Sequence, residues 1–268
     1  MSGQTSQDGA NRAEWGGAVL EFPGPAADGD LCVLGWAMEL EPATPEQVLR
    51  WAHGRWGSEL TLATSFQAEG MVLLHMCRQL GLPVRIVTLD TGRLPEETFR
   101  HIEHVRLHYG VDVEIVAPRA SDVARLVKRE GPNLFYASVD GRQRCCNVRK
   151  VEPMRRALAR TPAWLSGLRR DQTPTRDVLN KVEVDRVTRT RGRLVKVCPL
   201  LDWTEDQVWG YIHEEGVPYH PLYDRGYRTI GCAPCTRPSR PGEGARGGRW
   251  WWESQSGKEC GLHVLQPR

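Results

Sequence analysis

Apolar and polar positions alternate in blocks along the middle of the chain. The mostly apolar segments 60–63 and 84–89 predict two strands, the first of them buried, and 111–116 is predicted as a third strand. Two longer segments, 71–80 and 95–109, place apolar residues at helical spacing, and a glycine follows each of them. Strands that alternate with helices through short loops favour an α/β fold with a parallel sheet and right-handed crossovers.

Further segments extend this pattern on both sides. The sequence Thr-Pro-Glu-Gln at 44–47 is typical of a capping box with proline at the first helical position, and it predicts a helix. Residues 163–165 have the character of another strand, and an arginine-rich hairpin is expected over 186–198. A second capping sequence at 204–207 predicts one more helix.

The length of 268 residues suits one sizeable domain with appendages. Residues 1–30 are small, polar and rich in Gly and Ala, which predicts a flexible arm. We therefore expect a Rossmann-like α/β domain over 31–240 and a mobile C-terminal tail over 241–268.

Polar turns follow three of the predicted strands. Because the carboxyl ends of parallel strands meet at one edge of a sheet, these turns are expected to share a ligand site. Hydroxyls and backbone N–H groups at a helix start hold phosphate, and an arginine fork matches phosphate or sulfate. The alternative is a set of ordinary capped turns with a solvated arginine pair. The candidate ligands are Ser65, Asp90, Gly92, Arg169 and Arg170.

Four cysteines have the character of metal ligands. Cys232 and Cys235 form the Cys-x-x-Cys half of a zinc site, but Cys145 and Cys146 are adjacent, so their side chains diverge. Adjacent cysteines fit one small tetrahedral ion poorly, whereas they can reach different irons of a larger cluster. The spacing favours a [4Fe-4S] cluster, with zinc as the alternative. Lys150 is either a cation beside this site or a surface cation.

A fifth cysteine, Cys260, lies in the tail between Lys258 and His263. Neighbouring cations lower the pKa of a thiol and increase its thiolate fraction. Cys260 is therefore a candidate nucleophile, and an inert terminal thiol is the alternative. The remaining cysteines have apolar neighbours and are expected in the core: Cys32, Cys77 and Cys198.

The overall charge and the cysteine usage narrow the class of protein. The formal net charge is only +3, so nucleic acid is not an expected partner. The start of the chain has no signal-peptide pattern, so its eight cysteines are expected in a reducing, cytoplasmic setting. No apolar run approaches the roughly 18 residues of a membrane helix, and no membrane partner is expected.

Taken together, these motifs resemble the assimilatory adenylyl-sulfate (APS) reductases, a family related to the phosphoadenylyl-sulfate (PAPS) reductases. The resemblance spans roughly residues 45–265, and the tandem cysteines, the Cys-x-x-Cys turn and the tail are highly specific as a set. The segments that carry it are Thr64–Gly70, Leu89–Gly92, Cys145–Pro153, Leu165–Arg170, Gly231–Arg237, Gly248–Glu253 and Lys258–His263.

The resemblance implies an adenine nucleotide alpha-hydrolase-like fold and a [4Fe-4S] cluster on the four cysteines, with Lys150 nearby. It also implies that the thiolate of Cys260 attacks the sulfate sulfur of APS, expels AMP and becomes a Cys-S-sulfonate. Reduced thioredoxin, or a glutaredoxin-like reductant, then releases sulfite. Attack on an anion requires cations around it. The residues expected to bind substrate are Ser65, Asp90, Gly92, Lys150, Arg169, Arg170, Arg246, Arg249 and His263.

Two alternatives to an APS reductase remain at this point. The chain lacks the Ser-Gly-Gly-x-Asp-Ser loop of relatives that cleave ATP to pyrophosphate, which argues against ATP hydrolysis. The cluster cysteines favour APS, but an enzyme for PAPS or for both nucleotides is the nearest rival. A non-catalytic iron-sulfur or zinc module that senses redox state or binds RNA is the rival of another class. The oligomeric state is open, and a homo-oligomer is among the states that the sequence allows.

Overall fold

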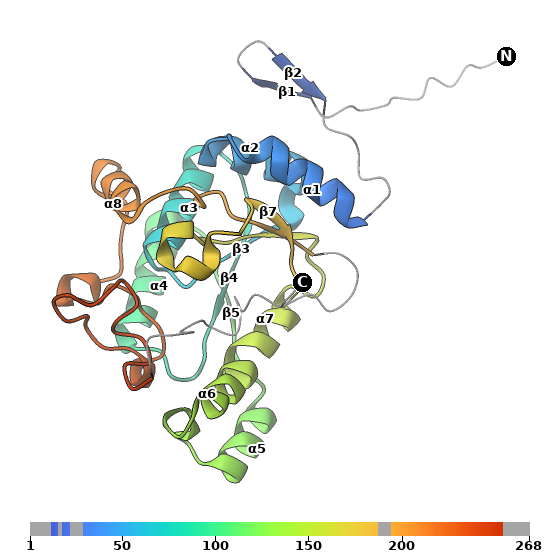
Figure 1. The fold of residues 1–268 in the computed structure, drawn as a ribbon. Helices are drawn as coiled ribbons and strands as arrows, with labels where there is room; N and C mark the ends of the chain where they lie inside the picture. Colours follow the sequence, from blue (N-terminus) through green and yellow to red (C-terminus); the bar gives the residue numbers. More distant parts are fainter. Residues whose placement is uncertain (1–11, 16–17, 22–28, 187–193, 254–268) are drawn as a thin grey trace.

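The computed structural model describes residues 12–15, 18–21, 29–186 and 194–253. A six-stranded sheet in the order β5-β4-β3-β6-β8-β7 runs through the described domain (Figure 1). All neighbouring strands are parallel except β7, which runs antiparallel to β8. The prediction of an α/β fold with a mostly parallel sheet is confirmed. The strands are β3 (Leu60–Ala63), β4 (Arg85–Leu89), β5 (Glu114–Val116), β6 (Ala163–Leu165), β7 (Val182–Val184) and β8 (Val195–Val197).

Helices connect the strands and cover the sheet. The helices are α1 (Gly29–Leu40), α2 (Pro45–Trp56), α3 (Ala68–Gln79), α4 (Glu96–Tyr109), α5 (Ala120–Glu130), α6 (Val139–Cys146), α7 (Glu152–Ala157) and α8 (Glu205–Glu214). A π-helical turn, Asn147–Val151, joins α6 directly to α7. The arm predicted over 1–30 contains a short antiparallel pair, β1 (Arg12–Trp15) and β2 (Ala18–Glu21).

Successive side chains of a strand face opposite sides of the sheet. Leu62 of β3 and Leu165 of β6 belong to the larger core, which also holds apolar residues of α2, α3, α4 and α8. Trp164 and Val87 face the other side, where they cluster with apolar residues of α7 such as Met154. The sheet therefore lies between two helical layers.

Both predicted capping boxes are present. Thr44 Oγ1 accepts from the backbone N–H of Gln47 at 3.3 Å, and Gln47 Oε1 accepts from the backbone N–H of Thr44 at 2.7 Å. Thr204 and Gln207 make the same reciprocal pair at the start of α8. These bonds satisfy N–H groups that the first helical turn leaves without partners, which is why the two helices begin where the sequence predicts.

Two predicted elements differ in extent or position, and one predicted core cysteine differs in burial. The third strand begins at Glu114, three residues later than predicted, because 111–113 has no ladder partner. The hairpin predicted over 186–198 is formed by β7 and β8, so its first strand lies before Asp185 rather than within the arginine-rich segment. Cys77 and Cys198 are buried as expected, but Cys32 is only half-buried.

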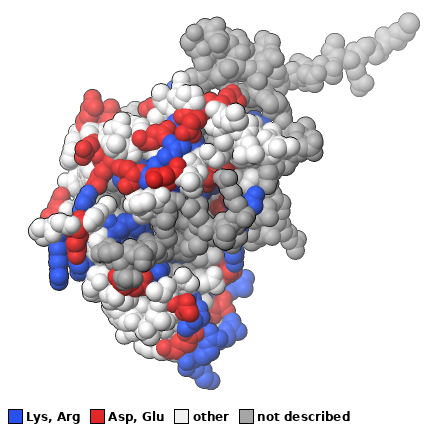
Figure 2. Space-filling view, in the orientation of Figure 1, with Lys and Arg blue, Asp and Glu red and all other residues white. Residues whose placement is uncertain are grey.

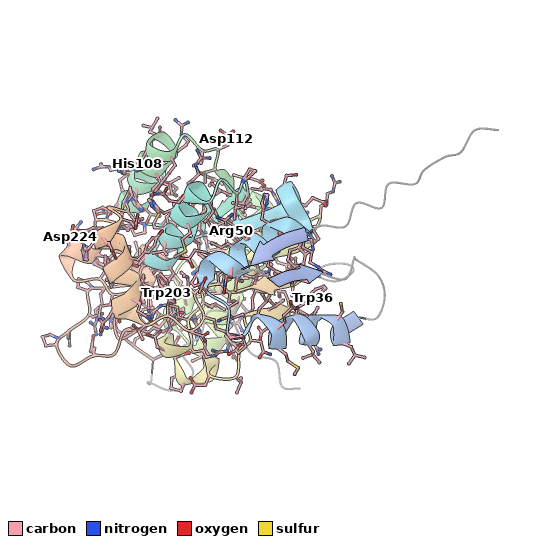
Figure 3. All side chains as sticks on the ribbon, turned by 90° about the horizontal axis from the view of Figure 1, so that it is seen from above. Trp36, Arg50, His108, Asp112, Trp203 and Asp224 are labelled. Atoms are coloured by element: carbon pink, nitrogen blue, oxygen red, sulfur yellow. The ribbon has the colours of Figure 1, made fainter. Side chains whose placement is uncertain are left out.

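A tryptophan cluster attaches α1 to α2. Trp36 of α1, labelled in Figure 3, meets Trp51 and Trp56 of α2 edge-on, with ring centroids 5.7 and 6.2 Å away. The guanidinium of Arg55 lies 4.0 Å from the centroid of the Trp36 ring.

On the face in Figure 2, basic and acidic side chains are intermingled over α5 and α6. Among the described residues, no helix combines the length and the apolar character needed to cross a bilayer.

Candidate active site

A cavity of about 250 Å³ opens at the carboxyl ends of β3, β4 and β6. From β3 the chain proceeds to β4 on one side of the sheet and later returns to β6 on the other, so this edge is a topological switch point. Ligands of open α/β sheets bind at such points. All three predicted turns contribute, with Ser65, Thr91 and Ser166 among the lining residues.

The turn after β3 is tightly constructed. Thr64 Oγ1 accepts from the backbone N–H of Phe66 at 2.9 Å, and Phe66 is fully buried with a positive φ of 54°. A β-carbon at Gly70 would lie 2.1 Å from Thr64 Oγ1, so a larger residue there would disrupt the turn. Ser65 lines the cavity, and its hydroxyl accepts from Gln67 Nε2 at 2.8 Å.

Two buried histidines, His101 and His220, lie next to this turn. Burial lowers the pKa of His101 to about 3 and the pKa of His220 to about 4, so both rings are neutral at pH 7. Their ring centroids are 5.3 Å apart. His220 Nδ1 accepts from the backbone N–H of Leu222, so its Nε2 carries the proton and donates to Thr98 Oγ1 at 3.0 Å. His101 makes a backbone hydrogen bond to Phe66, the strained residue of the turn.

In the second turn, the residue that reaches the cavity is Thr91. Asp90 Oδ1 accepts from the backbone N–H of Gly92 at 2.7 Å, an Asx-type bond that closes the turn. Gly92 has φ +68°, and Arg149 Nη1 would lie 3.2 Å from a β-carbon there. Asp90 and Gly92 therefore shape the turn, whereas Thr91 lines the cavity and places its Oγ1 3.2 Å from Cys232 Sγ.

The two predicted arginines of the third turn point to different places. Arg169 lines the cavity, but it is paired with Glu69 at 3.0 Å and with Asp171 at 2.6 Å. Arg170 is absent from the cavity lining among the described residues and pairs with Glu41 and Asp202. Extended backbone at Arg169 (φ −128°, ψ 147°) sends successive side chains to opposite sides, so one arginine of the pair faces away.

Arg249 is a buried cation of the cavity wall that has no carboxylate partner among the described residues. Arg249 is 6 % exposed and lines the cavity, and its Nη1 donates to the carbonyl of Ile230 at 3.3 Å. Its guanidinium stacks 4.6 Å from the centroid of the buried Trp250 ring. Arg246 lines the same cavity. A buried cation requires compensation, and a bound anion would supply it at Arg249.

A second, much smaller cavity gathers the four predicted ligand cysteines. Burial raises the pKa of Cys145, an effect that Arg149 opposes and Cys232 reinforces. Burial, together with Cys232, also raises the pKa of Cys235 to about 12. Within the described residues, no three His, Cys, Asp or Glu side chains are arranged to hold a single metal ion. The residues around this cavity are Arg93, Phe135, Arg142, Cys145, Cys146, Arg149, Lys150, Cys232, Cys235 and Trp250.

Lys150 lines both cavities, so the larger cavity and the cysteine cavity share a cationic residue in their walls. It sits in the π-helical turn Asn147–Val151, which follows the tandem cysteines directly. π-Turns inside helices are frequent at functional sites because they redirect side chains. The predicted position of Lys150 near the cysteines is consistent with this geometry.

Sequence reasoning missed several residues of the cavity wall. Tyr223, whose hydroxyl accepts from the backbone N–H of Ala68 at the start of α3, carries no sequence signal because its partner is 155 positions away. Glu69 compensates Arg169 and was not predicted to do so. Arg176 and Arg228 also line the cavity. Cys260 and His263 lie outside the described residues.

Fold and cavities define an α/β protein with a cation-lined cavity at the switch point of its sheet, beside four clustered thiols. Residues 59–238 match the family model of the phosphoadenosine phosphosulfate reductase domain, and the chain belongs to this family. Adenosine 5'-phosphosulfate reductase of Allochromatium vinosum is 51 % identical over 204 residues, covering 76 % of this chain and 78 % of the relative.

Two further relatives agree with this membership. Adenosine 5'-phosphosulfate reductase of a Pseudomonas aeruginosa strain is 44 % identical over 230 residues, covering 85 % of each chain. The crystal structure of a phosphoadenylyl-sulfate reductase from Candida auris superposes with a TM-score of 0.65 at 28 % identity. It covers 79 % of this chain and 98 % of that one.

Proposed function

We propose that this protein reduces adenosine 5'-phosphosulfate to sulfite and AMP. The observation that carries the proposal is the shared wall of the two cavities, where Lys150 adjoins both an anion-binding switch point and four clustered thiols. The named relatives support APS as the substrate. The cysteines support a reducing, cytoplasmic setting, since none of the seven in the described part is in a disulfide.

The proposed reaction begins with Cys260 as a thiolate. Its sulfur attacks the sulfate sulfur of APS, the bond from that sulfur to the bridging oxygen breaks, and AMP leaves with the electron pair. The product on the enzyme is a Cys-S-sulfonate. A dithiol protein of the thioredoxin or glutaredoxin kind then reduces the sulfur–sulfur bond, releases sulfite and becomes a disulfide.

Residues of the cavity wall provide the electrostatics for this step. A thiolate and a sulfate repel one another, so cations must neutralise the sulfonyl and phosphate oxygens. Arg249 and Lys150 fit this role best, because both line the cavity and Arg249 is buried without a carboxylate partner in the described part of the chain. Arg169 already pairs with two carboxylates, so we propose that it stabilises the turn that contains Glu69.

The lining of the four-thiol site supports a polynuclear cluster. Four cysteines surround one small cavity with cations on its walls, and two of these cysteines are adjacent in the chain, as ligands of different irons can be. We therefore propose that Cys145, Cys146, Cys232 and Cys235 hold a [4Fe-4S] cluster. When bound, the cluster would keep the four thiols as thiolates and set the charge that Lys150 faces; no reaction step is assigned to it.

The metal proposal has a direct test. Protein purified without oxygen is expected to be yellow-brown and to contain about four irons per chain. A colourless protein with one zinc per chain would contradict it.

The substrate is tested by comparing turnover of APS and PAPS under identical conditions with reduced thioredoxin. A strong preference for APS is expected. A strong preference for PAPS would overturn the substrate assignment, and no turnover of either nucleotide would favour a non-catalytic module.

The Gly231→Ala substitution is expected to lower kcat/KM for APS by about 10-fold or more, because misplaced charge at the reacting centre is costly. A β-carbon at Gly231 would lie 2.6 Å from the guanidinium carbon of Arg249 and displace it. The melting temperature is expected to change little, because the clash is with the end of a side chain. Gly244→Ala is the control, since its β-carbon meets no atom within 4 Å. Equal activities of the two variants would contradict the role of Arg249.

A further inference from the structure

Glu253 is the last residue that the structure describes before Cys260, and it forms a buried ion pair with Arg142. Arg142 Nε donates to Glu253 Oε1 at 2.6 Å, and the two side chains are 1 % and 8 % exposed. Arg142 belongs to α6, one helical turn before Cys145 and Cys146. The pair therefore joins the segment that leads to Cys260 to the helix that carries the tandem cysteines.

Burial distinguishes this ion pair from its neighbours. On the same helix, Arg144 pairs with Glu130 at 2.7 Å, but these side chains are 48 % and 17 % exposed. Exposed pairs contribute little to stability, whereas breaking a buried pair leaves a charge without compensation in a poorly solvated place. Glu253 is therefore held at Arg142 more strongly than a surface contact would hold it.

The same contact reaches Arg249 through Trp250. The Arg142 guanidinium lies 4.3 Å from the centroid of the Trp250 ring, and the Arg249 guanidinium lies 4.6 Å from it. Trp250 is fully buried with φ +43°, and its carbonyl accepts from the backbone N–H of Glu253 at 2.9 Å. The turn from 250 to 253 thus has one end beside the anion-binding arginine and the other on α6.

We propose that the Arg142–Glu253 pair is a positioning device that fixes the origin of the Cys260 tail and the orientation of Arg249 at once. This inference rests on the proposed function. Cys260 is seven residues beyond Glu253, so the tail can span about 25 Å at most. Fixing its origin within the protein limits the volume that the thiol samples and raises its effective concentration at the cavity.

The test measures sulfonation of Cys260 in a single turnover with APS and no reductant. Glu253→Gln keeps the shape of the side chain but removes the negative charge that Arg142 Nε faces. We expect the sulfonation rate to fall by about 10- to 100-fold, because small misplacements at a reacting centre have effects of this size. Iron content is expected to stay within about twofold of wild type, and AMP affinity is expected to fall less than the sulfonation rate, because Arg249 also faces the phosphate whereas the position of Cys260 affects only the covalent step. Glu130→Gln, which breaks the exposed pair on the same helix, is the matched control and is expected to react at the wild-type rate.

A second variant covers the case in which Glu253→Gln folds poorly. Arg142→Gln combined with Glu253→Gln removes both charges and retains a neutral hydrogen-bonding pair, so the double variant is expected to react faster than the single variant. A wild-type rate in Glu253→Gln would overturn the inference. A parallel fall of rate, AMP affinity and iron content would also overturn it, as the role would then be structural. If the wild-type protein forms no sulfonate at Cys260, the proposed function itself fails.

Discussion

The Cys260→Ser variant is expected to release no measurable sulfite from APS while binding AMP as tightly as the wild-type protein. A hydroxyl at this position is a far weaker nucleophile than a thiolate, so the covalent step is lost; removing a nucleophile of this kind costs on the order of 10⁴-fold or more. AMP affinity is expected to persist because the cavity is lined by residues of the α/β domain. Sulfite release and AMP binding by calorimetry are the two measurements.

Cys32→Ser is the matched control for this experiment. Cys32 is a half-buried thiol on α1 and lines neither cavity, so its replacement is expected to leave sulfite release unchanged. Sulfite release by Cys260→Ser near the wild-type rate would remove Cys260 from the mechanism. Loss of activity in both variants would indicate an effect unrelated to the nucleophile.

The second large effect is expected at Arg249. Arg249→Ala should lower kcat for APS by about 10²- to 10³-fold, because it removes a buried cation from the site where the sulfonyl and phosphate charges develop. Arg249→Lys restores the charge without the planar fork and should recover part of this loss. Steady-state kinetics, with a melting curve to confirm folding, measure both variants.

Arg170→Ala is the control for Arg249→Ala, because it also removes an arginine side chain. Arg170 pairs with Glu41 and Asp202 away from the cavity. Its removal should therefore lower the melting temperature and leave kcat close to the wild-type value. A larger loss of kcat in Arg170→Ala than in Arg249→Ala would contradict the assignment of the anion site.

Local signals account for the part of the fold that the sequence predicts. The strands at 60–63 and 163–165 are mostly apolar because both their faces are covered by helices. α2 and α8 begin at reciprocal capping boxes, which are encoded within four residues. Such signals need no knowledge of the rest of the chain.

α6 was not predicted because a buried contact that holds it is distant and polar, and α7 is only six residues long. The sequence of α6 is rich in charged residues and cysteines, and its buried Arg142 has its partner 111 positions further on. Periodicity of apolar residues cannot reveal a helix of this kind. The π-helical turn that follows also interrupts the regular spacing of side chains.

The candidate site was predicted at the level of turns and not of individual side chains. Ser65, Lys150 and Arg249 line the cavity, and their binding of substrate stays a prediction. The compensation of Arg169 by Glu69, one hundred positions earlier, could not be foreseen, because it depends on how two loops meet at the sheet edge. Thr91 rather than Asp90 reaches the cavity for the same reason.

The most direct test of the account is mass spectrometry of the protein after incubation with sulfur-labelled APS and no reductant. Labelled sulfonate on Cys260 and release of AMP in equal amount are expected, with the label leaving as sulfite when reduced thioredoxin is added. Labelled sulfonate on another cysteine, or release of AMP and sulfite with no label on the protein at any time, would contradict it.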